Sequence, residues 1–412
     1  MHAAQAGPGA RGEPDRLWTG PFALAWVSHF MHATGLHAYV HAAGWLDERG
    51  AGEVLIGVLF SLMAVSAVLI RPFIGRLMDT RGRKPVLLLG GALHLLATLL
   101  YLAVDALPGQ PWLAIAGVRV VHGLAQASLF SVLFTYAADL IPERRRAEGI
   151  AIFGVSGMIP IAVGGLVGDL VIVDGDYRGL FATTAVAAGL GLLLSLPLRE
   201  TQRSGSGPGR SFLAAGLAPE LRPLWFMGIA FAVGLSAYFV FLKTYLAVAP
   251  QVGTMGMFFT AYALSAVVLR LTLGWLPERV GMMRVLLPSV VLAVGGLVLL
   301  ALSEGPPGLI TAGVLCGIGH GYAFPILSAL VVTRARADER GSALSLFTAL
   351  FDIGLLIGGP LFGLSVRMVG YPGSFMLAGV VLFVATVIFG LWEAARSRAE
   401  AITAAPGSPK IG

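Results

Sequence analysis

The chain has 412 residues, of which 57% are hydrophobic and only 12% are charged. Soluble domains carry about a quarter of charged residues, so this composition excludes an ordinary water-exposed surface. The mean hydropathy is +0.83, and apolar stretches of roughly 20 residues recur, each long enough to cross a hydrocarbon core about 30 Å thick. The sequence therefore predicts an all-α membrane protein. It contains no Gly-x-x-x-x-Gly-Lys-Ser/Thr loop for nucleotides, and we expect no enzyme activity and no cofactor.

Twelve transmembrane helices are predicted in chain order. They lie near residues 22–45, 54–75, 85–104, 111–138, 148–170, 179–198, 223–247, 254–276, 283–303, 308–332, 342–366 and 373–394. The expected domains are a disordered N-terminus (1–20), a first six-helix bundle (21–198), a linker (199–222), a second six-helix bundle (223–395) and a tail (396–412). The single cysteine, Cys316, excludes an intramolecular disulfide.

Positive charge is concentrated on one side of the expected spans. The 28 Lys and Arg residues lie in the termini, in the even-numbered loops or at span edges, except for Arg49, Arg119, Arg178, Lys243 and Arg367. The positive-inside rule then places both termini in the cytoplasm and the protein in the inner membrane. The net charge of +6 is explained by topology, so the expected partner is the lipid bilayer and not a nucleic acid.

The chain also contains an internal duplication. An offset of 199 residues aligns Trp26 with Trp225 and Arg71 with Arg270, and an offset of 194 aligns Gly123 with Gly317. Further pairs are Gly57 and Gly256, Ser66 and Ser265, Gly82 and Gly281, Phe153 and Phe347, and Gly165 and Gly359. A duplicated membrane chain places its working site between the two halves.

The loop after the second span has a distinctive pattern, Gly-x-x-x-Asp-x-x-Gly-Arg-Lys, which begins at Gly75. It resembles the signature loop of the major facilitator superfamily, with Thr80 where that family usually has Arg. The resemblance implies two six-helix bundles and a loop that latches them together on the cytoplasmic side. The alternative is a basic loop that only fixes topology. The residues of this expected gating loop are Gly75, Asp79, Gly82, Arg83 and Lys84.

Two further segments resemble motifs of the same family. The fourth span carries Arg119 with His122, Gly123 and Gln126, which is similar to a motif associated with proton coupling. The fifth span carries a glycine-rich segment around Pro160, which is similar, with altered spacing, to a motif of exporters. The resemblance therefore implies export coupled to protons.

Polar membrane residues without a counterpart in the other half form the candidate site. The first span contributes four histidines within about half of the helix circumference, so we expect them to line a substrate or proton path. Interhelical packing is one alternative. A metal or haem site is another, and it would need ligands from other helices; no metal is expected. The candidate residues are His29, His32, His37, His41, His94, Arg119, His122, Gln126, His320 and Asp352.

Asp352 is the one carboxylate expected near the middle of the bilayer. An acid at that depth is costly, and it marks a functional position that loads and releases a proton. The alternative is a permanent ion pair with a basic group, for which Arg119 is a candidate.

Together these features predict a monomeric secondary transporter that exports a small organic compound by alternating access, coupled to protons. Uptake of a sugar or an organic acid is the main alternative, and a membrane sensor or a metal- or haem-binding protein is another. Arg119 and several histidines face a single Asp in the candidate set, which favours an anionic, zwitterionic or sugar-like solute.

Overall fold

The computed structural model describes residues 16–142, 145–201, 218–336 and 340–404, and this part of the chain is helical apart from loops and one isolated bridge between Val173 and Asp176. The first half contains α1 (Gly20–Ala38), η1 (Tyr39–His41), α2 (Ala42–Glu48), α3 (Glu53–Arg81), α4 (Arg83–Asp105), α5 (Trp112–Leu140), α6 (Arg146–Val171) and α7 (Arg178–Ser195). The second half contains α9 (Arg222–Val248), η3 (Pro250–Val252), α10 (Met255–Leu273), α11 (Leu276–Val280), α12 (Met282–Ala301), α13 (Pro306–Arg334) and α14 (Arg340–Ala404).

Ten helices of the described chain are long and apolar enough to cross a membrane. One of them is α14, whose backbone leaves the helical conformation at Gly370, where φ is 73°. The expected first span is not among the ten, although α1 has 19 residues, because His29, His32 and His37 lower its hydropathy. The segment η1 separates α1 from α2. Dividing α14 at Gly370 gives eleven such helices. The twelfth expected span corresponds to α1 with α2, which is helical but less apolar than the others. Helical structure is required here because backbone groups in lipid have no water to bind.

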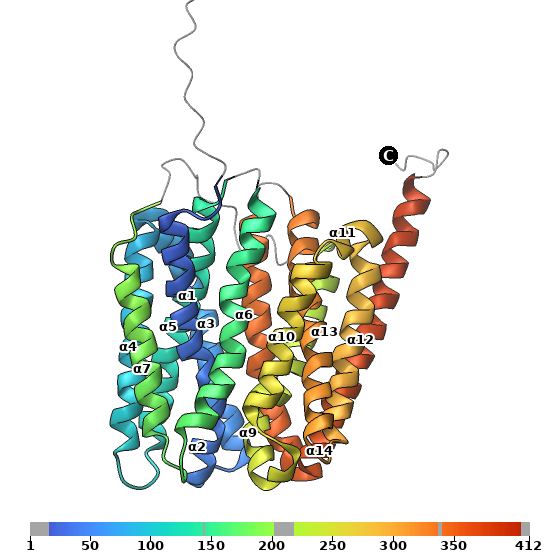
Figure 1. Ribbon diagram of the computed structural model, residues 1–412. Coiled ribbons are helices and arrows are strands. Elements are labelled where there is room, and N and C mark those ends of the chain that lie inside the picture. The colour runs from blue at the N-terminus through green and yellow to red at the C-terminus, as the bar shows by residue number, and fades with distance from the viewer. Residues whose placement is uncertain (1–15, 143–144, 202–217, 337–339, 405–412) are drawn as a thin grey trace, which may run out of the picture.

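The helices form two bundles that stand side by side (Figure 1). The start of α1 and the end of α14 lie at the same end of the molecule, which we call the terminal end, and α2 lies at the opposite end. The helix α14 continues to Ala404, into the segment expected to be a tail.

Glycines with positive φ end equivalent helices in the two halves. Gly82 separates α3 from α4 with φ 98°, and Gly281 separates α11 from α12 with φ 108°. Such a backbone is accessible to glycine without strain. Helix packing repeats as well: Gly123 lies against Met63 and Ser66, and its counterpart Gly317 lies against the matching Tyr262 and Ser265. The duplication seen in the sequence is therefore present in the three-dimensional structure.

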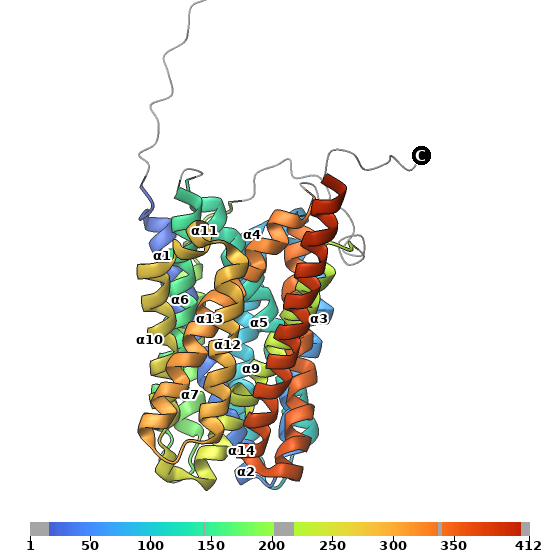
Figure 2. The ribbon, with the colours of Figure 1, turned by 90° about the vertical axis from the view of Figure 1, so that its right-hand side faces the viewer.

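Two helix pairs join the halves. The helix α3 packs against α14, and we call this contact the first seam; α6 packs against α10, which we call the second seam (Figure 2). At the opposite end, an added Cβ at Gly57 would overlap with the carbonyl oxygen of Gly359, and one at Gly165 would lie 3.2 Å from the carbonyl oxygen of Met255. Only glycine permits backbones to approach this closely in a membrane bundle.

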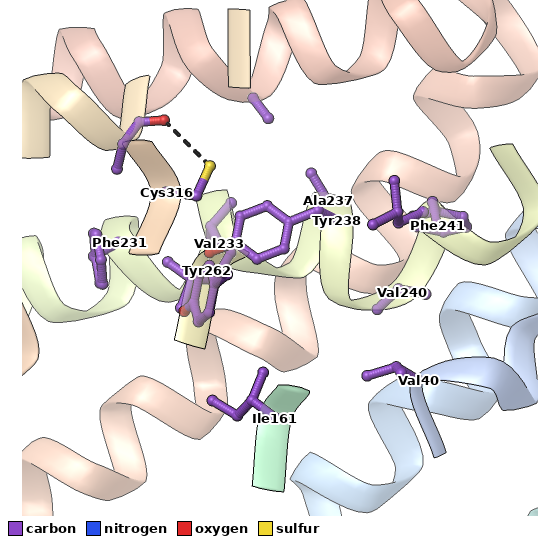
Figure 3. Close-up of a cluster of buried hydrophobic side chains, with 14 of the residues drawn as sticks. Val40, Ile161, Phe231, Val233, Ala237, Tyr238, Val240, Phe241, Tyr262 and Cys316 are labelled. Atoms are coloured by element: carbon purple, nitrogen blue, oxygen red, sulfur yellow. Dashed lines mark hydrogen bonds between the residues drawn. The ribbon is translucent and has the colours of Figure 1, made fainter. Parts of the chain in front are cut away.

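The apolar core continues from one half into the other. Figure 3 shows Val40 and Ile161 of the first half beside Tyr238 and Tyr262 of the second, and all four belong to one buried cluster. Cys316 is buried in the same cluster, where its Sγ lies 3.9 Å from the carbonyl oxygen of Ala293. The halves are thus packed together at this level.

Candidate functional site

An ion pair between Asp352 and Arg71 crosses the first seam. The Nε and Nη2 atoms of Arg71 on α3 donate to Oδ2 of Asp352 on α14 at 2.8 and 2.6 Å. The two side chains are only 8% and 11% exposed, and Nη1 of Arg71 lies 3.4 Å from the Ser131 hydroxyl. The sequence analysis placed Arg71 at the edge of a span, but α3 continues for ten residues beyond it to Arg81. The partner of Asp352 is therefore Arg71 and not Arg119.

Arg119 is buried inside the first half. Its Nε donates to the carbonyl oxygen of Leu59 at 3.1 Å, and its Nη1 donates to the Tyr101 hydroxyl at 3.3 Å. Its guanidinium lies 4.1 Å from the centre of the Phe60 ring, and only 2% of the residue is exposed. These contacts hold the charge by hydrogen bonds and a cation–π interaction, and they leave no open face for a solute.

The histidines of the first span do not share one path. His29 and His41 face α6, where His29 Nδ1 lies 2.6 Å from the Ser156 hydroxyl and His41 Nε2 lies 3.0 Å from the carbonyl oxygen of Gly165. His32 faces α4 and lies 3.1 Å from His94. His37 is half-buried. The expected ladder is therefore divided between two neighbouring helices.

Three of the predicted histidines form a buried row inside the first half. The ring centres of His32 and His94 are 5.3 Å apart, and those of His94 and His122 are 5.6 Å apart. His122 continues the row to the Tyr101 hydroxyl at 3.5 Å. The Nε2 atoms of all three rings are buried without a hydrogen-bond partner in the described chain. Within that same part, no group of three or more His, Cys, Asp or Glu side chains converges to hold a metal ion.

A second group of polar residues lies in the second half. The Tyr262 hydroxyl is hydrogen-bonded to Nδ1 of His320, and Phe231, Phe324 and Phe351 surround the His320 ring. Arg270 lies beside this group, because its Nε donates to the carbonyl oxygen of Gly321, the residue after His320, at 3.1 Å. The predicted Gln126 is half-buried and makes no hydrogen bond to the described residues. The structure therefore separates the candidate residues into an ion pair in the first seam, a row in the first half and a group in the second.

The expected gating loop is held by the first half. Glu200 accepts hydrogen bonds from the backbone N–H groups of Arg83 and Lys84 at 2.8 and 3.0 Å, at the start of α4. Arg83 Nε lies 3.3 Å from an oxygen of Asp139, and a Cβ at Gly82 would overlap with Glu200. Gly75 has nothing within 4 Å of an added Cβ. The side chain of Asp79 lies outside the described part of the structure.

Three interface residues were not found as site candidates from the sequence. Arg71 and Arg270 match each other in the duplication, so neither was among the candidates, which were residues without a counterpart in the other half. Asp169 lies at the end of the fifth predicted span and was not among the candidates, but its Oδ2 accepts a hydrogen bond from the backbone N–H of Gly256 at 2.6 Å, across the second seam. A carboxylate is favourable there because α10 begins at Met255 and helix N-termini are positive.

The fold and this polar interface define a multi-pass membrane protein built from two related bundles. The chain belongs to the Major Facilitator Superfamily, whose sequence profile matches residues 25–249 and 224–409. It is a membrane transporter and not an enzyme.

Relatives and solved structures agree with this assignment. The MFS-type transporter YhhS of Salmonella enteritidis PT4 is 26% identical over 360 residues, which cover 86% of each chain. An MFS-type transporter of Pseudomonas aeruginosa strain LESB58 is 26% identical over 348 residues, 83% of this chain and 84% of that protein. The crystal structure of the nucleoside transporter NupG superposes with a TM-score of 0.75 at 15% identity, covering 90% of this chain and 99% of that one. At this identity the last comparison shows the shared fold alone.

Proposed function

We propose that this chain is a proton-coupled secondary transporter that exports a small organic compound across the cytoplasmic membrane as a monomer. The observation that carries the proposal is the Arg71–Asp352 pair, because it joins the two halves through a titratable group at membrane depth. The glycine-rich segment of α6 resembles a motif of exporters, and this resemblance favours export over uptake.

Protonation of Asp352 changes the stability of the first seam. When ionised, Asp352 holds Arg71 by two charge-assisted hydrogen bonds. When protonated, it loses the attraction that keeps α3 and α14 in register, so the equilibrium between the two access states shifts. One group then responds both to the proton gradient and to the positions of the halves.

The two ends of the interface fit alternating access between rigid halves. The opposite end is sealed by the Gly57–Gly359 contact and by the hydrogen bond from Gly256 to Asp169. The described contacts of the gating loop lie within the first half. In the proposed cycle this structure corresponds to the state closed at the opposite end, and the loop that includes Asp79 latches the halves in the other state.

Substituting Asp352→Asn tests the coupling. Everted membrane vesicles with an acidic interior are screened for accumulation of radiolabelled organic anions, zwitterions, sugars and cations. We expect wild-type vesicles to concentrate at least one compound, and Asp352→Asn to exchange that compound while failing to concentrate it, because the amide takes up no proton.

A matched double variant separates coupling from folding. Asn at position 352 leaves Arg71 as an unpaired buried charge, which costs about 3–5 kcal/mol, whereas Arg71→Gln with Asp352→Asn removes both charges. If the double variant folds normally and still concentrates the compound, the coupling role is wrong. Accumulation in right-side-out vesicles driven by external acid would instead indicate uptake.

A further inference from the structure

The duplication places one arginine in each seam. Arg71 and Arg270 occupy matching positions, each fourteen residues after the matched glycines Gly57 and Gly256. At a rise of about 1.5 Å per residue, each arginine lies roughly 21 Å from the glycine contact of its own seam. Arg71 lies ten residues before the end of α3, whereas Arg270 lies in the last turn of α10. Both helices contact the other half.

The two arginines differ in what neutralises them. Asp352 pairs with Arg71 in the first seam, but the position that matches Asp352 in the second seam is Met158. Among the described residues no carboxylate pairs with Arg270; its one hydrogen bond runs from Nε to the carbonyl oxygen of Gly321 at 3.1 Å. A cation without a counter-ion in a membrane-spanning helix is costly, so it requires a partner.

The charged end of Arg270 remains accessible. Neither terminal nitrogen makes a hydrogen bond to the described chain, and neither is sealed from solvent, in contrast to the orphan nitrogens of His32 and His94. Across the seam, α6 presents Gly154, where even an added Cβ would lie 3.5 Å from Nη1 of Arg270. No side chain at this position of α6 stands between the guanidinium and a solute.

We infer that Arg270 binds the anionic group of the transported compound, which is an organic monoanion with an aromatic or apolar body. The inference rests on the proposed transport function and specifies its substrate class. A guanidinium with two free nitrogens holds a carboxylate through two parallel hydrogen bonds. The single unneutralised charge matches a monoanion. The hydrogen bond from Arg270 to Gly321 places the guanidinium next to the segment that carries His320, which is bonded to Tyr262.

The ring environment specifies the body of the compound. Phe324 and Phe351 are half-buried and lie with ring centres 6.2 and 6.5 Å from His320. Aromatic walls favour flat apolar groups by stacking or edge-to-face contacts. Arg119 offers no equivalent site, because its guanidinium is covered by Phe60 and bonded to Tyr101.

Calorimetric binding to the purified full-length protein, without any proton gradient, tests the inference. The probes are benzoate, phenylacetate and indole-3-acetate, with neutral benzamide as the matched comparison for benzoate. We expect benzoate to bind the wild type about tenfold or more tightly than benzamide, since a hydrogen bond to a charged group is worth at least that factor. Arg270→Gln should abolish the difference, and Arg270→Lys should keep most of it.

Arg367→Gln is the matched control, because it removes one cation from an exposed position on α14 and should preserve the preference for benzoate. Failure of all three carboxylates to bind, equal binding of benzamide, or an unchanged preference in Arg270→Gln would overturn the inference. The wild-type comparison keeps the test decisive even if Arg270→Gln misfolds. If transport is proton-driven and depends on Asp352 but carboxylates are not transported, only this inference is rejected. If carboxylates bind through Arg270 but Asp352→Asn transports normally, only the proposed coupling is rejected.

Discussion

At the scale of single residues, the buried imidazole rings occupy space that glycines leave open. An added Cβ at Gly191 would lie 2.8 Å from the His32 ring, and one at Gly35 would lie 3.0 Å from the ring of His94. Gly157 stands in the same relation to His29, at 3.1 Å. A large planar ring thus fits between closely packed helices because the neighbouring helix has no side chain there.

Gly191→Ala should destabilise the first half. The methyl group would collide with the His32 ring on several atoms, and overpacking of this kind costs about 1–3 kcal/mol. Gly189→Ala is the control, since its Cβ would lie 3.9 Å from the nearest atom, and alanine is favourable inside a helix. Thermal unfolding in detergent should show a lower Tm for Gly191→Ala alone; equal Tm values would contradict the packing role.

The sequence identified Asp352 but not its partner, and the reason is physical. An acidic residue in the middle of an apolar span is unusual, and the sequence shows this whichever group is its partner. The partner depends on which helices of the two halves touch, and this is not encoded in local spacing. Because Arg71 has a twin in Arg270, comparison of the repeats left it out of the candidates. The asymmetry lies at the matching positions of α14 and α6, which carry Asp352 and Met158.

At the scale of helices, the seams determine which end of the molecule is closed. Each seam has a glycine contact at the opposite end, and the second adds the hydrogen bond from the backbone N–H of Gly256 to Asp169. The glycine contacts need two backbones to approach closely, and the hydrogen bond needs the Asp169 carboxylate at the start of α10. Any rocking of the halves that opens that end therefore breaks them. Periodicity in the sequence predicted the helices, but the closed end follows from contacts between distant segments.

Gly57→Ala should shift the protein toward the state open at the opposite end. Its Cβ would overlap with backbone atoms of Gly359, which cannot move aside as a side chain would. Strain of about 1.4 kcal/mol in the closed state changes the population ratio about tenfold. A cysteine at the buried Ser61 position reports the change as faster labelling by a small thiol reagent.

The control for this shift is Gly117→Ala on α5, where an added Cβ meets nothing within 4 Å. Labelling at position 61 should keep its original rate in that variant. If Gly57→Ala labels no faster than Gly117→Ala, the glycine contact does not govern closure of the opposite end.

At the scale of the whole molecule, the duplication builds two similar seams and lets their chemistry diverge. Hydrophobic spans, the repeat and the signature loop predicted the family and the two-bundle fold, because each is a regular feature of the chain. The break of the first span at η1 was not foreseen, since residues 39–41 are as apolar as their neighbours apart from His41. We expect functional residues at the positions where the charges of the two seams differ, as they do at Asp352 and Arg270.

The arrangement of charges predicts the orientation of the whole bundle in the membrane. Arg279 on α11 lies at the terminal end and Asp47 on α2 lies at the opposite end (Figure 1), and both are exposed. The positive-inside rule then places α11 in the cytoplasm and α2 outside it. In intact cells, an impermeant thiol reagent should label Asp47→Cys, and it should label Arg279→Cys only after permeabilisation. The native Cys316 is buried and gives little background. Labelling of both positions from the same side would contradict the bundle topology, and the reverse pattern would place both chain ends outside and turn the proposed export into uptake.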